Sequence, residues 1–485
     1  MGDRQELARA QTLANGGDGA GAVALYRRYI DSLLRAGDHI DGVVWHNFAS
    51  LQGDGGFHAE AAQSCENAFK AGLQAPETWL VYGRSLQAIG KLDAAEDAFS
   101  TALGKRPTDP VVHRDLAQLI WMRTGDAARA LVPLTRIEAQ FPADDQLKSL
   151  RAQIFTQMGM DREAFAHLDA LLKKATDQSP WLLPHGEAAL RAGHYGPAEE
   201  SLIRARSQFG DHDQILEPLV RLGLAIGPDE KTAALIDRLR AGAPHNQYFC
   251  ALEATAWRLV DDPRHDAFYE ASSLVHGFEL KVPRGWGSLG AYLDDLCTAL
   301  DTRHPFAAHP FGLSVRHGSQ LASIEAMDDP ALRAFPEAAM GPVTHYLAAL
   351  ADHLPADSPV WRGAEGRKAV QDDPAGAARL LAAWSVRLPA NGFHVNHVHP
   401  AGWLSSACHL RTVEAVPGDE PRAGWIKFGE PGIATVRPLA PTHMREPQAG
   451  VMVLFPSFLW HGTVPFSGSE SRLTIAADFS RRAVI

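Results

Sequence analysis

Small residues recur at regular intervals in the N-terminal half of the chain, within apolar stretches of helical spacing. One series has intervals of 34, 34, 35 and 34 residues, and a second has intervals of 34, 33, 36 and 34. Two helices cross closely only where their side chains are small, so two phased series predict repeated helical hairpins. The series are Ala49, Gly83, Ala117, Ala152 and Gly186, and Ala61, Ala95, Ala128, Ala164 and Ala198.

The clearest unit runs from Pro76 to Pro107 and resembles a tetratricopeptide repeat. The flanking units resemble this family with decay, and the unit from Thr108 has Pro133 inside its second helix, which predicts a kink or a displaced boundary. We expect about five or six repeats between residues 5 and 210, with further helices to about residue 265. The positions that match the family are Trp79, Tyr82, Gly83, Leu86, Ala95, Phe99, Ala102 and Pro107.

An array of this kind predicts a macromolecular partner. Stacked helical hairpins form a superhelix whose concave face commonly binds extended peptides. The alternative is an array that serves only as a scaffold or as a dimerisation surface, and the sequence does not separate the two. We therefore expect a peptide or protein partner, while the oligomeric state is not indicated.

The repeat phase is lost from Pro283, where Gly, Pro and His become more frequent. We place the domain boundary near residue 270, with a helical array at 1–270 and a second domain at 271–485. In the second domain, Asp329–His353 has the apolar spacing of a helix. Short apolar runs separated by turns then predict an antiparallel β domain, and a jelly roll is the leading choice. These runs are Ala382–Leu388, Leu404–Val413, Trp425–Phe428, Gly450–Phe455 and Leu473–Phe479.

Three histidines in this β region have the spacing of a metal site. His397 and His399 are two positions apart, so on an extended strand both side chains point to the same face, and His461 comes from a distant strand. Three imidazoles can occupy one face of an ion and leave other positions open. His394 falls on the opposite face from His397 in an extended segment, so we expect it outside the ligand set, as a supporting or substrate-contacting group.

These histidines stand in segments that resemble 2-oxoglutarate- and Fe(II)-dependent oxygenases of the double-stranded β-helix type, which bacteria fuse to tetratricopeptide repeats. The resemblance covers about residues 305 to 480 and implies an N-terminal α-solenoid followed by a jelly roll with flanking helices. The segments are His309–Gln320, His397–Pro400, Trp403–Ser406, Gly450–His461 and Ser471–Thr474.

The resemblance also implies the chemistry of the site. Iron would be held by His397, His399 and His461, and the enzyme would use O2 and 2-oxoglutarate to hydroxylate a C–H bond, with no catalytic residue beyond the metal centre. By position, Arg472 would bind the distal carboxylate of 2-oxoglutarate through two hydrogen bonds, and Thr474 would donate its hydroxyl to it.

Four further residues are candidates for substrate contact. Arg316 and Gln320 lie in the first segment of the resemblance, and a structural hydrogen-bonding role is an equal alternative for both. His394 adjoins the metal motif. Trp403 is a candidate as well, with a place in the core or the pocket wall as its alternative.

One departure from the family pattern leaves other functions open. The usual iron triad contains a carboxylate, yet no Asp or Glu occurs between Asn391 and Val413. Either His399 replaces it or the protein supplies two ligands. Three histidines also resemble a catalytic zinc site, so a zinc hydrolase is one alternative, and a tetratricopeptide adaptor with a degenerate β domain is another.

We therefore expect a cytoplasmic dioxygenase that hydroxylates a peptide or protein side chain recruited by the array; the substrate and the hydroxylated atom are not indicated. Charge and composition narrow the partners. A net charge of −11 without a long Lys/Arg run excludes nucleic acid as the main partner, and no apolar run approaches the ~18 residues of a membrane-spanning helix. Four widely spaced cysteines predict neither disulfides nor a thiolate zinc site, which favours the reducing cytoplasm.

Overall fold

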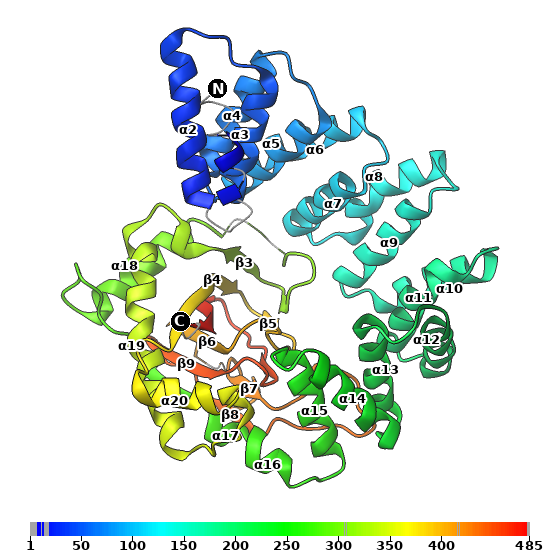
Figure 1. The fold of residues 1–485 in the computed structure, drawn as a ribbon, viewed down its shortest axis with the longest axis vertical. Coiled ribbons are helices and arrows are strands. Elements are labelled where there is room, and N and C mark those ends of the chain that lie inside the picture. The colour runs from blue at the N-terminus through cyan, green and yellow to red at the C-terminus, as the bar shows by residue number, and fades with distance from the viewer. Residues whose placement is uncertain are drawn as a thin grey trace. The chain divides into compact units, whose positions relative to one another are not determined.

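A computed structural model describes residues 7–10, 12–13, 19–304, 306, 308–414, 416 and 418–482 (Figure 1). The expected start of the array near residue 5 lies outside these ranges. The chain divides into two compact units, Met1–Ile154 and Phe155–Ile485. The predicted fold class is confirmed, because helical hairpins come first and antiparallel β-sheets with flanking helices follow. The predicted domain boundary near residue 270 marks the end of the helical array, and it stays a prediction.

The first unit is built of helical hairpins. A glycine with positive φ lies in the turn of each hairpin, for example Gly56 and Gly90, because glycine adopts this conformation without a steric penalty. The helices are α2 (Gly19–Ala36), α3 (Gly42–Asp54), α4 (His58–Lys70), α5 (Pro76–Ala88), α6 (Leu92–Lys105), α7 (Pro110–Thr124) and α8 (Ala127–Gln140), and α9 (Asp145–Gln157) begins in this unit and ends in the next.

The same period continues into the second unit. The first helices of successive hairpins begin at residues 42, 76, 110, 145, 179, 213 and 247, which is every 34 or 35 residues. Helical hairpins with this period therefore continue beyond residue 210, in the region where further helices are expected. The helices that continue them are α10 (Asp161–Lys174), α11 (Ser179–Arg191), α12 (Tyr195–Phe209), α13 (Asp213–Ile226), α14 (Glu230–Gly242), α15 (Gln247–Leu259) and α16 (Arg264–Tyr269).

Small residues lie at the helix crossings, as expected, with one correction. A Cβ added to Gly83 on α5 would lie 2.6 Å from the ring of Phe99 on α6, so any larger residue would force this ring to move. Ala128 of the second series is exposed, whereas Ala130 is 1% exposed and lies at the contact. The helix boundary is displaced by one residue in this unit, and α8 continues through Pro133.

The β domain contains two facing layers of antiparallel strands. A six-stranded sheet has the order β1-β9-β6-β11-β4-β3, a three-stranded sheet has the order β10-β7-β8, and β2 pairs with β5. A bridge between His397 and His461 continues the smaller layer from β10 toward β5. The strands are β1 (His276–Glu279), β2 (Val315–Arg316), β3 (Ser319–Ala322), β4 (Ala378–Leu388), β5 (Phe393–His394), β6 (Leu404–Arg411), β7 (Ile426–Phe428), β8 (His443–Arg445), β9 (Val451–Pro456), β10 (His461–Thr463) and β11 (Arg472–Arg481).

From β4 to β11 the chain moves back and forth between the two layers. β4, β6, β9 and β11 lie in the large sheet, and β5, β7, β8 and β10 belong to the smaller layer. This winding is that of a double-stranded β-helix. The expected apolar runs all form strands of it, whereas β5, β8 and β10 have two or three residues each and gave no periodic signal.

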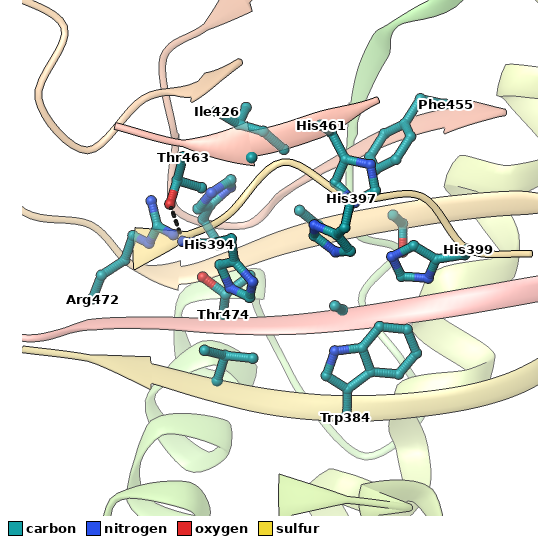
Figure 2. Close-up of a pocket in the computed structure, with 16 residues that line it drawn as sticks. Trp384, His394, His397, His399, Ile426, Phe455, His461, Thr463, Arg472 and Thr474 are labelled. Carbon is teal, nitrogen blue, oxygen red and sulfur yellow. Dashed lines mark hydrogen bonds between the residues drawn. The ribbon is translucent and has the colours of Figure 1, made fainter. Parts of the chain in front are cut away.

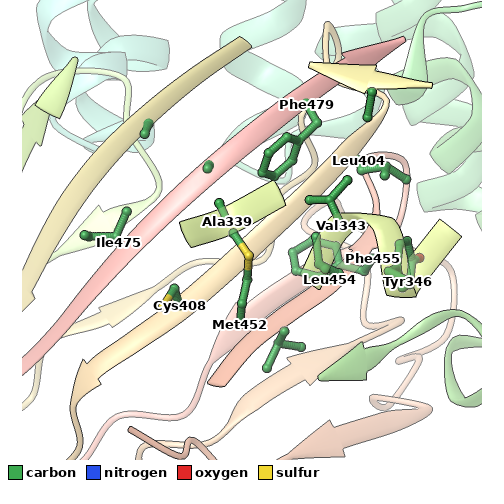
Figure 3. Close-up of a cluster of buried hydrophobic side chains, with 14 of the residues drawn as sticks. Ala339, Val343, Tyr346, Leu404, Cys408, Met452, Leu454, Phe455, Ile475 and Phe479 are labelled. Carbon is green, nitrogen blue, oxygen red and sulfur yellow. The ribbon is translucent and has the colours of Figure 1, made fainter. Parts of the chain in front are cut away.

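Helices cover one face of the large sheet. The predicted helix at Asp329–His353 is α19 (Pro330–His353), and Asp329 caps it by accepting hydrogen bonds from two backbone N–H groups. Its apolar side packs on the sheet, and Figure 3 shows Val343 and Tyr346 of α19 among strand residues such as Leu454 and Phe479. The other flanking helices are α17 (Ala271–Leu274), α18 (Leu289–Asp301) and α20 (Ala364–Asp372).

The last repeats pack against the β domain within the second unit. Residues of α13 and α15 form a buried apolar cluster with Leu439, which lies in the long connection between β7 and β8. Arg258 on α15 donates hydrogen bonds of 2.7 Å to the carbonyls of Gly429 and Ala440. Trp460 donates from its indole Nε1 to the hydroxyl of Thr255, at 3.0 Å. These repeats are therefore part of the body that contains the site.

Among the described residues, no helix has both the length and the apolar character that a membrane crossing requires.

Candidate metal centre and adjoining pocket

The structure brings His397, His399 and His461 together. Each offers one ring nitrogen, and the three nitrogens lie within 4.8 Å of one another. Two backbone hydrogen bonds between His397 and His461, of 2.9 and 3.0 Å, fix the segment before His399 against β10. Figure 2 shows the three side chains directed into one pocket. Within the part of the chain that the structure describes, this is the one group of such residues close enough to share a metal ion.

Each of these imidazoles is oriented by a hydrogen bond from its Nδ1. His397 lies 2.9 Å from the carbonyl of Val395, and His461 lies 2.9 Å from the carbonyl of Leu459. Because carbonyl oxygens only accept, Nδ1 carries the proton in both rings and Nε2 keeps its lone pair. This is the usual way in which proteins prepare histidines for a metal.

The carboxylate of Asp478 orients His399 in the same way, through a hydrogen bond with Nδ1 of this ring. Its oxygens lie 2.8 and 2.9 Å from Nδ1 of His399, and its Oδ1 also accepts from the hydroxyl of Ser405 at 2.7 Å. Nε2 of His399 is buried and has no hydrogen-bond partner. A buried, unpaired nitrogen carries a desolvation penalty unless a ligand occupies it, so the atom fits a metal site.

Burial keeps the imidazoles of His397 and His461 neutral. It lowers the pKa of His397 to about 3, with a further contribution from neighbouring His399, and it lowers the pKa of His461 well below its usual range. Metals bind the neutral imidazole, so these rings are in the required protonation state at physiological pH.

His394 also lines the pocket, which differs from the expectation for an extended segment. The regular strand ends at His394, and the chain bends at Asn396 before the bridge at His397. The rings of His394 and His397 are consequently nearly parallel, with centroids 5.8 Å apart. The hydroxyl of Ser314 lies between them, 3.0 Å from Nδ1 of His394 and 3.2 Å from Nε2 of His397.

Arg472 occupies the other end of the pocket (Figure 2). It is 2% exposed, and burial lowers its pKa to about 10, so the guanidinium stays charged. Its Nη1 donates to the carbonyl of Gly424 at 2.7 Å, while its buried Nε has no partner. A buried cation with a free N–H and no carboxylate partner in the described structure fits the binding of an anion.

Two further polar groups line this end. The hydroxyl of Thr474, two residues along the same strand, is buried without a partner. Nδ1 of His409 on β6 is also unpaired, and burial followed by the charge of Arg472 lowers the pKa of His409 to about 3. Apolar side chains such as Val386 and Ile426 complete the wall.

Arg316, Gln320 and Trp403 do not line this pocket. Arg316, on β2, donates to the carbonyls of the nearby residues Leu313 and Val315. Gln320 lies on β3, and Trp403 is in the core, where its Nε1 donates to the carbonyl of Val360. Their substrate roles stay predictions, and the contacts of Arg316 and Trp403 favour the structural alternative for these two residues.

Sequence reasoning did not identify Asp478, Ser314 or Trp384 as part of the site. Asp478 reaches His399 because β11 pairs with β6, a register that the residues themselves do not reveal. Trp384 stacks on the ring of His399, with centroids 5.4 Å apart. The one available signal was Asp478 itself, an acidic residue within the otherwise apolar run Leu473–Phe479.

Comparison with known protein families agrees with this geometry. Residues 382–478 match the family described as "Putative 2OG-Fe(II) oxygenase", and residues 90–154 match a tetratricopeptide repeat. The predicted resemblance is therefore confirmed: the chain contains a tetratricopeptide region and a C-terminal region of this oxygenase family. No curated protein matches the chain significantly.

Solved structures show weaker similarity. A tetratricopeptide repeat protein from Parabacteroides merdae is 11% identical, with a TM-score of 0.37, and the match covers 52% of this chain and 98% of that one. A prolyl-4-hydroxylase from Pseudomonas putida is 18% identical, with a TM-score of 0.28, over 47% of this chain and 98% of that one.

Proposed function

We propose that the chain is a 2-oxoglutarate- and Fe(II)-dependent dioxygenase that hydroxylates a peptide or protein side chain. The main support is that one pocket contains both the imidazoles of His397, His399 and His461 and the buried guanidinium of Arg472 with its free N–H. A simple metal site does not need a buried cation, whereas a site for a metal-bound dicarboxylate does. The family match over residues 382–478 supports the same conclusion.

The residues present fit both groups. Three neutral imidazoles can hold Fe(II) through Nε2 and contribute no charge, so an anionic co-substrate balances the ion. Iron and 2-oxoglutarate, when bound, supply the activation of O2 that oxidises a C–H bond of the substrate. Asp478 holds the His399 ring in place, which substitutes in part for the carboxylate that the usual ligand set contains.

The opposite end of the pocket orients the co-substrate. Arg472 presents N–H groups on a rigid fork, which matches a carboxylate better than the flexible ammonium of a lysine does. The hydroxyl of Thr474 is free to donate to the same carboxylate. The apolar wall excludes water from the carbon chain between the two ends, which strengthens the hydrogen bonds at both.

In this proposal, the helical repeats bind and recruit the macromolecular substrate. Repeats of this type bind extended peptides along a concave surface, and the last of them pack against the β domain. A peptide captured by the array would therefore be held near the body that contains the metal centre.

The test is succinate formation by the full-length protein. Protein loaded with Fe(II) under anaerobic conditions and then exposed to O2 should convert 2-oxoglutarate to succinate, slowly without substrate. His461→Ala should abolish this, because two imidazoles hold the ion poorly. His345→Ala, which removes an exposed histidine on α19, should leave it unchanged.

A zinc hydrolase would behave differently in the same assay. The protein would retain zinc through dialysis, and 2-oxoglutarate would not raise its melting temperature. A protein that binds neither iron nor 2-oxoglutarate would be a tetratricopeptide adaptor, and the dioxygenase proposal would be rejected.

A further inference from the structure

Four basic side chains lie together beside the turn that follows His399. Arg240 comes from α14, His245 precedes α15, Arg362 precedes α20 and Arg481 ends β11. Burial and the charges of the three guanidiniums lower the pKa of His245, so each guanidinium lies within electrostatic reach of this imidazole. We refer to Arg240, His245, Arg362 and Arg481 as the basic cluster.

One side chain of the basic cluster, that of Arg362, is hydrogen-bonded to the turn at 400–402. Nη2 of Arg362 donates to the carbonyl of Gly402 at 2.6 Å, and Nη1 of Arg481 donates to the carbonyl of Trp361 at 3.2 Å. The backbone N–H of Gln247 donates to the carbonyl of Pro400 at 3.1 Å. Residues 400 and 401 are exposed, so a ligand can approach the turn from solvent.

The basic cluster has little counter-charge. Within the described ranges, the only carboxylate at ion-pair distance from any of the four is that of Glu253, 3.8 Å from Nε of Arg240. Nε of Arg362 is buried and has no partner. The charges of Arg362 and Arg481 repel each other, and the chain as a whole is acidic, with a net charge of −11. An anion bound here would offset both the repulsion and the unpaired N–H.

We propose that the basic cluster is a subsite for an anionic side chain of the peptide substrate, a carboxylate or a phosphate. This inference rests on the proposed function. The turn comprises the three residues after His399. A chain advances at most about 3.5 Å per residue, so the turn lies within about 10 Å of the backbone of His399. An extended peptide covers the same distance in about three residues, so the anionic residue should lie one to three positions from the hydroxylated one.

Binding of model peptides to the full-length protein tests the subsite without iron or 2-oxoglutarate. Fluorescein-labelled hexaglutamate should bind at least about tenfold more tightly than hexaglutamine in fluorescence anisotropy, and added salt should weaken it because exposed charges are screened. A hexapeptide with one phosphoserine identifies the source of the anion: tighter binding than hexaglutamate assigns phosphate, and weaker binding assigns carboxylate.

Variants connect the binding to the basic cluster. Arg481→Gln should weaken hexaglutamate binding about fivefold, the upper range for one exposed ion pair, and Arg481→Lys should restore most of it. His245→Gln offers a second variant that removes no hydrogen bond to the turn. Arg284→Gln, which removes an exposed guanidinium elsewhere in the second unit, should have no effect.

Three results would overturn the inference: equal binding of hexaglutamate and hexaglutamine, unchanged binding by Arg481→Gln, or tighter binding of a single-stranded oligonucleotide than of either anionic peptide. The outcome is independent of the proposed function because the assay contains no iron. Anion binding without succinate formation would reject the dioxygenase while leaving an anion site, and succinate formation without anion binding would reject only the subsite.

Discussion

Helices with the same period have different partners on the two sides of Ile154. In the first unit α5 packs on α6, where Gly83 allows the ring of Phe99 to approach its backbone. In the second unit α15 packs on the β domain, where Thr255 accepts a hydrogen bond from Trp460, the residue before His461. The repeat signature is clear in the first case and faded in the second. A repeat thus loses its signature where its surface must fit another kind of structure.

Truncation tests this comparison with the largest expected effect. A fragment of residues 271–485 would lack α13 and α15, so Leu439 would lose its apolar partners and Trp460 would lose its acceptor. We expect it to lack a cooperative unfolding transition and to bind no metal. A fragment of residues 155–485 should retain both, as measured by circular dichroism and by calorimetric titration with Fe(II). Normal metal binding by the shorter fragment would show that the last repeats are independent of the site.

The same contrast explains what the sequence reveals about the fold. The helix α19 is recognisable because it buries one face, and the strands around Leu404 and Leu473 are recognisable because they are continuous apolar runs buried over most of their length. Short strands such as β5 and β10 have too few residues for any period. The sequence predicts Ala128 at a helix crossing where the structure has Ala130. The two alanines are two positions apart and equally small, but only Ala130 faces the partner helix.

The site was predictable only where its residues are neighbours in sequence or match a family motif. His397 and His399 share a face because of strand periodicity, His461 completes the set as a third histidine from a distant strand, and the role of Arg472 is implied by the resemblance. Asp478 and Ser314 reach the histidines through strand pairing and loop packing, which are tertiary features. His394 points into the pocket because the chain bends at Asn396, whereas an extended segment would direct it away.

The substitution Asp478→Asn should produce the next largest effect, a loss of metal affinity in the second unit. The amide cannot provide the negative charge that orients and polarises His399, so we expect metal affinity to fall about 10- to 100-fold. The measurement is competition with a metal-sensitive chelating dye. Asp301→Asn, which breaks a surface ion pair with Arg411, serves as the control and should leave the affinity unchanged. Equal loss in both variants would indicate a general effect of charge.

Gly83→Ala tests the first unit alone. Its new Cβ would lie 2.6 Å from the Phe99 ring, and forcing such an overlap costs about 1–3 kcal/mol. The free energy of unfolding of the first unit, measured in urea, should fall by this amount while metal affinity stays constant. Gly104→Ala on α6 meets no atom within 4 Å, so it should not destabilise the unit. Reduced metal affinity in Gly83→Ala would show that the units are coupled.

Thr255→Val should have the smallest effect and addresses the contact between α15 and the site most directly. Valine keeps the shape of threonine, but Trp460 is 6% exposed and its Nε1 would lose its acceptor, which costs about 1 kcal/mol. Because Trp460 precedes His461, metal affinity should fall by a few fold together with stability. Thr344→Val on α19 is the matched control: both threonine hydroxyls donate to the carbonyl four residues earlier, but only Thr255 also accepts from a tryptophan. If both variants lose stability and neither loses metal affinity, α15 supports the fold of the second unit without positioning the ligand.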